Sequence, residues 1–245
     1  MAVTGRSKKR VRQYARVKKR LRMRRQSFYG RKSSLTNKIK RVVLANTEAK
    51  CKVLVVNDSQ QVAAVPAVHT QLTSIQNGNS PSSKLGNEVL SRLYSRRFYF
   101  SNTTANPIYI RVLSFWTKKP ISEAIMYDIN QYKDITYNDS SIVGTKKVLS
   151  VQPSRKYCRK VMDQTIFVSA NTMEHRNRAH IGSSSLKNLK IIYDLNEEAA
   201  DHQNWQFITI LYAYSPNIAE GTTGGKQENV SYTYNSEERF FFKDP

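Results

Sequence analysis

Basic side chains are concentrated at one end of this sequence, in a pattern suited to neutralising a polyanion. The first 41 residues contain 17 Lys or Arg and no Asp or Glu, and the first acidic residue is Glu48. The 245-residue chain has a net charge of +22, but the segment after residue 41, with 23 basic and 18 acidic residues, contributes only +5. Nucleic acid is the usual partner of such a run, because each neutralised phosphate releases condensed counterions. We therefore expect the following residues to bind nucleic acid: Arg6, Lys8, Lys9, Arg10, Arg12, Arg16, Lys18, Lys19, Arg20, Arg22, Arg24, Arg25, Arg31, Lys32, Lys38, Lys40 and Arg41.

Residues 1–47 are expected to form a basic arm that is disordered, or partly helical. Like charges repel within such a run, and its apolar surface is too small to offset the entropy lost on folding. Val11, Tyr14, Val17 and Leu21 have the spacing of a narrow helical stripe, so neutralisation by phosphates would favour partial helix. A basic helix lying on a membrane surface is an alternative, but it needs a wider apolar face.

The arm also contains two short basic runs, Lys8-Lys9-Arg10 and Lys18-Lys19-Arg20, that are typical of nuclear localisation signals. A nuclear import receptor is therefore a candidate partner, and its binding does not exclude that of nucleic acid. No apolar run reaches the ~18 residues of a membrane helix, and no apolar region of a signal peptide follows the basic start. We expect no insertion into a membrane.

Two further candidates for nucleic-acid binding, Arg92 and Arg96, lie in the body of the chain. They alternate with Tyr94 and Phe98 on one face of a predicted strand, while Arg97 and Tyr99 lie on the other. Basic and aromatic side chains interleaved in this way can stack unpaired bases. Alternatively, the rings pack the core and the arginines extend to solvent or pair at an interface.

A second basic group in the body surrounds Tyr157. Its members are Arg155, Lys156, Arg159 and Lys160. It is either a further contact for nucleic acid, a solvated loop or a contact between subunits.

Residue types that carry catalysis or bind metals occur here without the spacing that such chemistry needs. His175 and His180 are five residues apart, which suits neither a helix face nor a strand face for a metal, and His69 and His202 are remote. The acidic cluster Glu197, Glu198 and Asp201 follows a predicted strand, and a charged loop or a calcium site would both explain it. We predict no enzymatic activity, no bound metal and no cofactor.

Two other features are also assigned to structure rather than to chemistry. Residues 221–226 resemble a phosphate-binding loop, but Glu220 and Gln227 stand where that motif requires Gly and Ser or Thr. The two cysteines, Cys51 and Cys158, are too few for a disulfide framework, so both are expected to be buried thiols in a reduced compartment.

The body, residues 48–245, shows the pattern of β-strands that would position these side chains. Short apolar or alternating runs separated by turn residues predict strands at 49–57, 88–100, 107–117, 145–151, 158–169, 185–195, 204–214 and 228–243. The strands ending at 100 and beginning at 107 are close enough for an antiparallel hairpin.

The body also shows no amphipathic helix, so a sandwich or barrel is expected. The continuous apolar run at 204–214 predicts a strand covered on both faces, and Trp116 and Trp205 are expected to be buried. Residues 118–143 are expected to be a surface excursion.

Several motifs of the body resemble those of the capsid proteins of circular, Rep-encoding single-stranded DNA viruses, the circovirus-like CRESS-DNA group. Ile75-Gln76-Asn77-Gly78, followed by Lys84-Leu85-Gly86-Asn87, is similar to that group's I-x-x-G and R-x-G-N pattern, with Lys84 in place of the usual Arg. The run Asn106–Val112 (NPIYIRV) resembles a second pattern, and Tyr232 through Phe242-Lys243-Asp244-Pro245 resembles the group's last strand.

This resemblance implies a single eight-stranded antiparallel jelly roll, made of two four-stranded sheets, behind the basic arm. It further implies a virion protein of which about sixty copies form a T=1 icosahedral shell around circular single-stranded DNA, with assembly in the host nucleus. A cell-surface receptor is then a further candidate partner. Two alternatives remain open, a cellular basic β-barrel protein of ribosomal or chromatin type and a capsid protein of a small RNA satellite virus.

Overall fold

The computed structural model describes residues 42, 49–123, 125–181, 186, 189–193, 204–217 and 230–244, without the side chains of His180 and Ile181. The chain divides into two units, Met1–Glu48 and Ala49–Pro245. The predictions for the arm therefore concern residues outside the described ranges, as do those for His202, the acidic cluster at 197–201 and the loop at 221–226. No helix within the described ranges is long and apolar enough to cross a membrane.

The described part of the second unit is all-β, and the named strands pair only in antiparallel fashion. Its elements are β1 (Ala49–Val62), β2 (Ala67–His69), the 3-10 turn η1 (Gln71–Thr73), β3 (Glu88–Asn102), β4 (Ile108–Thr117), β5 (Met126–Asp128), β6 (Lys133–Ile135), the 3-10 turn η2 (Lys146–Leu149), β7 (Gln152–Pro153), β8 (Cys158–Val168), β9 (Thr172–Ile181), β10 (Lys190–Ile192), β11 (Gln206–Tyr214) and β12 (Ser231–Lys243).

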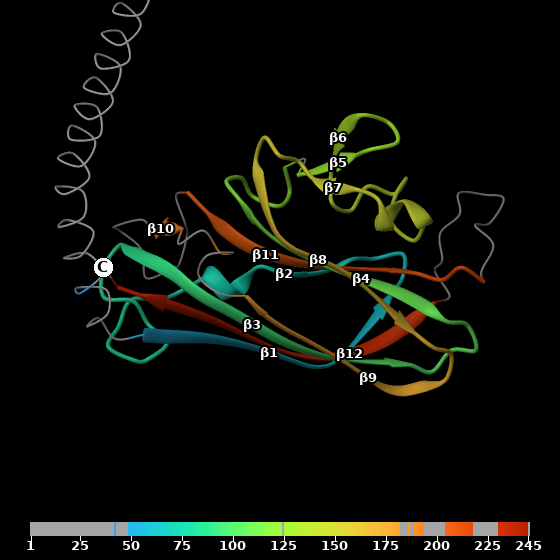
Figure 1. Ribbon diagram of the computed structural model, residues 1–245, viewed down its shortest axis with the longest axis horizontal. Helices are drawn as coiled ribbons and strands as arrows, with labels where there is room; N and C mark the ends of the chain where they lie inside the picture. Colours follow the sequence, from blue (N-terminus) through green and yellow to red (C-terminus); the bar gives the residue numbers. More distant parts are fainter. Residues whose placement is uncertain are drawn as a thin grey trace, which may run out of the picture. The chain divides into compact units, whose positions relative to one another are not determined.

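Two main sheets face each other across the core of this unit (Figure 1). In the first, β1, β12 and β3 are hydrogen-bonded in that order, and the other edge of β3 pairs with β9 and β10. In the second, the order is β2-β11-β4-β8. Strands near the beginning of the unit therefore pair with strands near its end, β1 with β12 and β2 with β11.

The outer face of the second sheet is covered by residues 118–123 and 125–157, which we call the cover. This stretch contains the small sheet β6-β5-β7, which Figure 1 shows on the side of β11, β4 and β8 away from the first sheet. Phe115 of β4 and Ile208 of β11 pack there against residues such as Ile125 and Val148 in one apolar cluster. We call this second sheet the covered sheet and the first, with β1, β12, β3, β9 and β10, the open sheet.

Arg111 of β4 connects the covered sheet to the cover through hydrogen bonds. Its side chain is buried; Nε and Nη2 donate to the two carboxylate oxygens of Asp163, at 2.7 and 2.8 Å. Nη1 donates to the backbone carbonyls of Val148 and Val151, at 2.8 and 2.6 Å. Burial raises the pKa of Asp163, but the hydrogen bonds and charge of Arg111 outweigh it and leave this pKa below its ordinary value.

The burial of the strands follows from this arrangement. In β11 only the first and last residues are not fully buried, which confirms the prediction of a strand covered on both faces. In β3, buried and less buried residues alternate over most of its length, as expected when one face meets the core. Trp116 and Trp205 are both buried, as predicted, with exposed fractions of 0% and 9%.

Six predicted strands correspond to strands of the structure, namely β1, β3, β4, β8, β11 and β12. The predicted hairpin of the strands at 88–100 and 107–117 is wrong, because β3 belongs to one sheet and β4 to the other. The turn between β3 and β4 passes from one sheet to the other, and the buried side chain of Asn102 stabilises it. Its amide donates to the carbonyls of Asn106 and Ser169, at 2.8 and 2.9 Å.

The other two predicted strands are corrected. Thr145 caps a 3-10 turn, accepting from the backbone N–H of Lys147, so that the range predicted as a strand, 145–151, contains η2 (Lys146–Leu149) and no strand. Within 185–195 the described strand is β10 alone. Five strands were not predicted. Four of them, β2, β5, β6 and β7, are only two or three residues long, and β9 has a largely polar sequence without apolar alternation.

Candidate nucleic-acid interface

The face of β3 that was predicted to stack bases lies in the core. Tyr94 and Phe98 are fully buried, and Arg96 is 1% exposed. Arg96 Nη2 donates to Gln164 Oε1 at 3.2 Å, and its guanidinium lies 5.3 Å from the centre of the Phe98 ring. These rings therefore pack in the core, where no base can stack on them. Arg92 is half-buried, and its contact with nucleic acid stays a prediction.

Arg96 belongs to a belt of polar side chains between the two sheets. On β3 it lies between Tyr94 and Phe98; on β4, Ser114 lies between Val112 and Trp116. The belt separates the inter-sheet core into two apolar clusters. Its other members are His69, Gln164, Thr209, Ser236 and Glu238.

Glu238, the central carboxylate of the belt, is fully buried. One of its oxygens is bonded to His69 Nδ1, and the other accepts from the Tyr94 hydroxyl. Burial, followed by the charge of Glu238, raises the pKa of Tyr94 well above its ordinary value. Because these groups are enclosed, their hydrogen bonds specify how the two sheets pack and offer no surface to a substrate.

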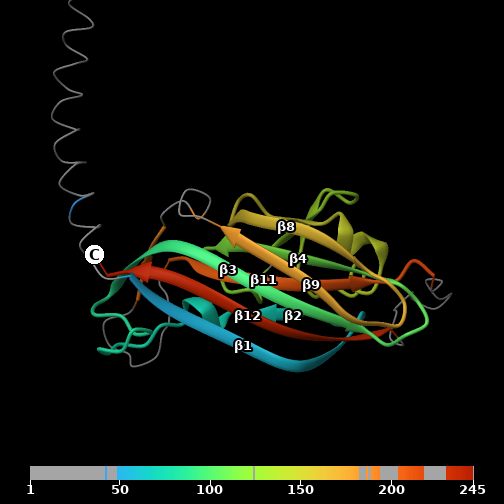
Figure 2. The same cartoon turned by 60° about the horizontal axis from the view of Figure 1, so that its bottom comes forward.

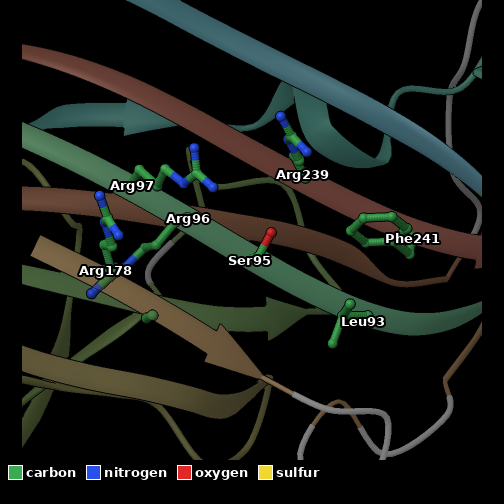
Figure 3. Close-up of a pocket in the computed structure, with 8 residues that line it drawn as sticks. Leu93, Ser95, Arg96, Arg97, Arg178, Arg239 and Phe241 are labelled. Carbon is green, nitrogen blue, oxygen red and sulfur yellow. The ribbon is translucent and has the colours of Figure 1, made fainter.

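The outer face of the open sheet carries basic side chains instead. Figure 2 shows β1, β12, β3 and β9 side by side, so that side chains of these strands with the same orientation share one surface. Arg97 of β3, Arg178 of β9 and Arg239 of β12 are exposed on it. Half-buried Leu93 and Phe241 lie on the same face and, with these arginines, line a hollow of about 430 Å³ (Figure 3).

A second basic surface lies where the cover joins β4 and β8, and it includes the predicted cluster around Tyr157. The ammonium groups of Lys119 and Lys156 lie 5.2 and 5.0 Å from the centre of the Tyr157 ring. Lys118 and Arg159 are placed similarly over Trp205, at 5.1 and 4.7 Å. The rings of this surface thus already have cations against them, which makes them less suited to receiving bases.

The sequence analysis placed Arg97 on the correct face but did not select it, and it selected neither Arg178 nor Arg239. Arg178 lies in β9, which was not recognised as a strand, and Arg239 precedes the run of three phenylalanines in β12. The usable signal was the pair Arg96-Arg97. Neighbouring residues of a strand point to opposite faces, so one of these two arginines had to face solvent once the aromatic side was assigned to the core.

Those of the remaining candidates for chemistry that lie in the described ranges do not form a site. Among the described residues, no three His, Cys, Asp or Glu side chains gather as metal ligands would. Both cysteines are free; Cys158 is buried as predicted, whereas Cys51 is only partly buried. Burial raises the pKa of the Cys158 thiol to about 11.

Comparisons with known proteins give weak structural similarities only. No family model and no curated protein matches this sequence. The chain is similar to one from the structure of infectious bursal disease virus strain Gx, with 9% identity and a TM-score of 0.35 over 80% of this chain and 32% of that one.

Two further solved structures give similar values. One is the T13 particle of the same virus, with 10% identity and a TM-score of 0.35 over 79% of this chain and 31% of that one. The other is the VP2 subviral particle of this virus, with 9% identity and a TM-score of 0.34 over 80% and 33%. This chain spans about a third of the length of each of these viral chains.

Proposed function

We propose that this protein is a viral capsid subunit that assembles into a small icosahedral shell and packages circular single-stranded DNA. The observation that carries the proposal is the separation of charge from fold. The first 41 residues hold 17 basic and no acidic residues, whereas the rest of the chain is nearly balanced and its described part is a two-sheet antiparallel body. A chain of this kind combines a wall-forming domain with a tail that needs a polyphosphate.

We further propose that the body is a jelly roll, in which eight strands form two four-stranded sheets. The pairing order supports this. If β9 and β10 are counted as one strand, the pairs β1–β12, β2–β11, β3–β9 and β4–β8 are those of a long hairpin wound around the core. The expected shell is a T=1 assembly of about sixty copies, since closed symmetric assemblies are the rule for self-associating subunits.

The arm would bind the genome through its phosphates. About sixty arms would carry on the order of 1000 positive charges, which is comparable to the phosphates of a small genome once residual counterions are included. Charge neutralisation of this kind needs no contact with base edges, so binding would tolerate any sequence and weaken steeply with salt. The role is structural rather than catalytic, in the virion and, during assembly, in the host nucleus.

Particle formation by the full-length chain tests this proposal. We expect particles of uniform size in electron micrographs, with contents that deoxyribonuclease degrades after the shells are opened. Contents that only ribonuclease degrades would favour the capsid protein of a small RNA satellite virus. Monomers at every salt concentration would contradict the proposal.

Two changes in the arm test its part in packaging. Replacing Lys8, Lys9, Arg10, Lys18, Lys19 and Arg20 by Gln should lower the nucleic-acid content of the particles. It should also reduce the slope of log K against log salt for single-stranded DNA by about 4, with folding unchanged. Deleting residues 1–41 should leave a chain that still forms empty or irregular shells. A cellular nucleic-acid-binding module would stay monomeric after this deletion.

A further inference from the structure

We propose that the outer face of the open sheet contains a second nucleic-acid site, which binds one nucleotide of a single strand between Arg97, Arg178 and Arg239 and the ring of Phe241. The three arginines come from three adjacent strands, β3, β9 and β12. Figure 3 shows their side chains around one hollow, with Leu93 and Phe241 further along it. The proposal deepens the packaging role and rests on it for the identity of the ligand.

The register of the strands brings two of these positive charges face to face. Arg97 and Arg178 are direct partners across the β3–β9 pair, and both are exposed. Like charges at directly opposite positions destabilise a sheet. Arg97 has an acidic partner, Glu237, at 3.5 Å, but no described acidic side chain is bonded to Arg178, so among the described residues the pair is only partly neutralised.

The third arginine adds to this excess of charge. Glu237 forms ion pairs with both Arg97, at 3.5 Å, and Arg239, so a single carboxylate serves these two arginines. Three cations and one anion leave the cluster with a net charge of about +2, which the two phosphates that flank one nucleotide of a strand would neutralise. A local arrangement that breaks the rules of sheet stability with only partial compensation is typical of a functional site.

The two ends of the hollow differ as the two parts of a nucleotide do. Arginine guanidinium groups match phosphate oxygens in geometry and charge. At the other end, Phe241 and Leu93 are half-buried and present apolar surface to the hollow. Single-strand binding sites combine a basic track for the backbone with aromatic platforms for the bases, which is the combination found here.

An acidic surface on a second copy of this chain would fit less well. Of the eleven carboxylates that the structure describes, seven already take part in ion pairs within the chain, namely Glu88, Glu123, Asp163, Glu174, Glu237, Glu238 and Asp244. Few are therefore free to neutralise arginines of a neighbour, whereas a nucleic acid supplies one negative charge with every nucleotide.

A photo-crosslinking experiment with the full-length chain tests the site separately from the arm. An oligodeoxynucleotide that contains 5-iododeoxyuridine should crosslink to the peptide containing Phe241. Arg97→Gln/Arg178→Gln should abolish this crosslink and reduce the slope of log K against log salt by about 1.4, the value for two phosphate contacts on a single strand. Phe241→Leu should abolish the crosslink while leaving the slope unchanged.

The matched control is Lys133→Gln/Lys146→Gln, which removes two exposed charges from the cover and should change neither readout. Crosslinks confined to residues 1–41, with an unchanged slope in Arg97→Gln/Arg178→Gln, would overturn the proposal. Heparin, a sulfated polymer, serves as a second probe. If Arg97→Gln/Arg178→Gln lost heparin binding but kept the crosslink, the arginines would bind a sulfated polymer instead of DNA, and the proposal would also be overturned. Electron microscopy of the same variants distinguishes failure of this site from failure of the capsid proposal. Each variant should still form shells, even if the second site does not bind DNA.

Discussion

The outer faces of the two main sheets differ in what lies against them, and the difference separates structural arginines from available ones. On the covered sheet, Arg111 is buried and all three of its nitrogens are hydrogen-bonded to the cover or to Asp163. On the open sheet, Arg97 is exposed and shares one carboxylate with Arg239. An arginine on a strand face is thus part of the fold or free for a ligand according to the layer above it.

The largest effect is expected from removing an aromatic ring beneath the cover. Phe115→Ala should lower the free energy of unfolding by about 3–5 kcal/mol, because it leaves a cavity in a closed apolar cluster. Phe241→Ala, on the open sheet, should cost about 1–2 kcal/mol, since this ring is only half-buried. Urea denaturation of both variants measures the difference. Equal costs would mean that the cover does not stay closed over the covered sheet.

The two arginines provide the next comparison. Arg111→Met should destabilise the fold by about 3 kcal/mol, because it leaves two buried carbonyl groups without their partner and removes the two shortest hydrogen bonds of Asp163, which keeps only Lys160 and Gln152, at 3.3 and 3.4 Å, among the described residues. Arg97→Met should change stability by less than about 0.5 kcal/mol, as is usual at exposed positions. Thermal unfolding of the two variants checks this prediction. A large loss in Arg97→Met would show that the arginines of the open face are needed for folding.

Acidification should destabilise the fold by protonating Asp163, the partner of Arg111. The pKa of Asp163 is lowered in the folded state, so its contribution to stability is present above its unfolded pKa and is lost as the pH falls through its folded pKa. The denaturation midpoint of the wild type should therefore exceed that of Asp163→Asn at about pH 6, and the two should converge toward about pH 2. A constant difference across this range would contradict the role of the ionised Asp163–Arg111 pair.

The smallest effect is expected for the two thiols, one in each main sheet. Cys158 lies in the cluster beneath the cover, and burial raises its pKa to about 11. Cys51 is partly buried on β1 of the open sheet, and its pKa is raised mainly by burial as well. Iodoacetamide should alkylate Cys51 first in the native protein, as mass spectrometry of the peptides would show. Faster labelling of Cys158 would indicate that the cover opens.

The parts of the fold that could be predicted from sequence are those where local pattern and burial agree. The apolar run of β11 predicted a strand covered on both faces, because both faces do meet apolar layers. In contrast, β9 was not recognised, since its contacts with β3 are made by the backbone and its side chains are largely polar. The switch of sheets between β3 and β4 was also missed, because the length of the connection resembles that of a hairpin.

The candidate site was predicted in part for a similar reason. The alternation in β3 correctly grouped Arg96 with Tyr94 and Phe98, but it does not state which face meets the core. Two buried aromatic rings decide that question, and they place Arg96 in the interior and Arg97 in solvent. The meeting of Arg97 with Arg178 depends on the register between β3 and β9, which no local pattern contains.

The central place of β12 in the open sheet has a consequence for the timing of folding. This strand is the last one described, yet it lies between β1 and β3 and pairs with both over almost its full length. Until residue 243 has been synthesised, β1 and β3 each present an unpaired edge to the crowded surroundings of the nascent chain. The rate-limiting event should therefore be the closing of a loop of nearly two hundred residues, from Ala49 to its partner Lys243.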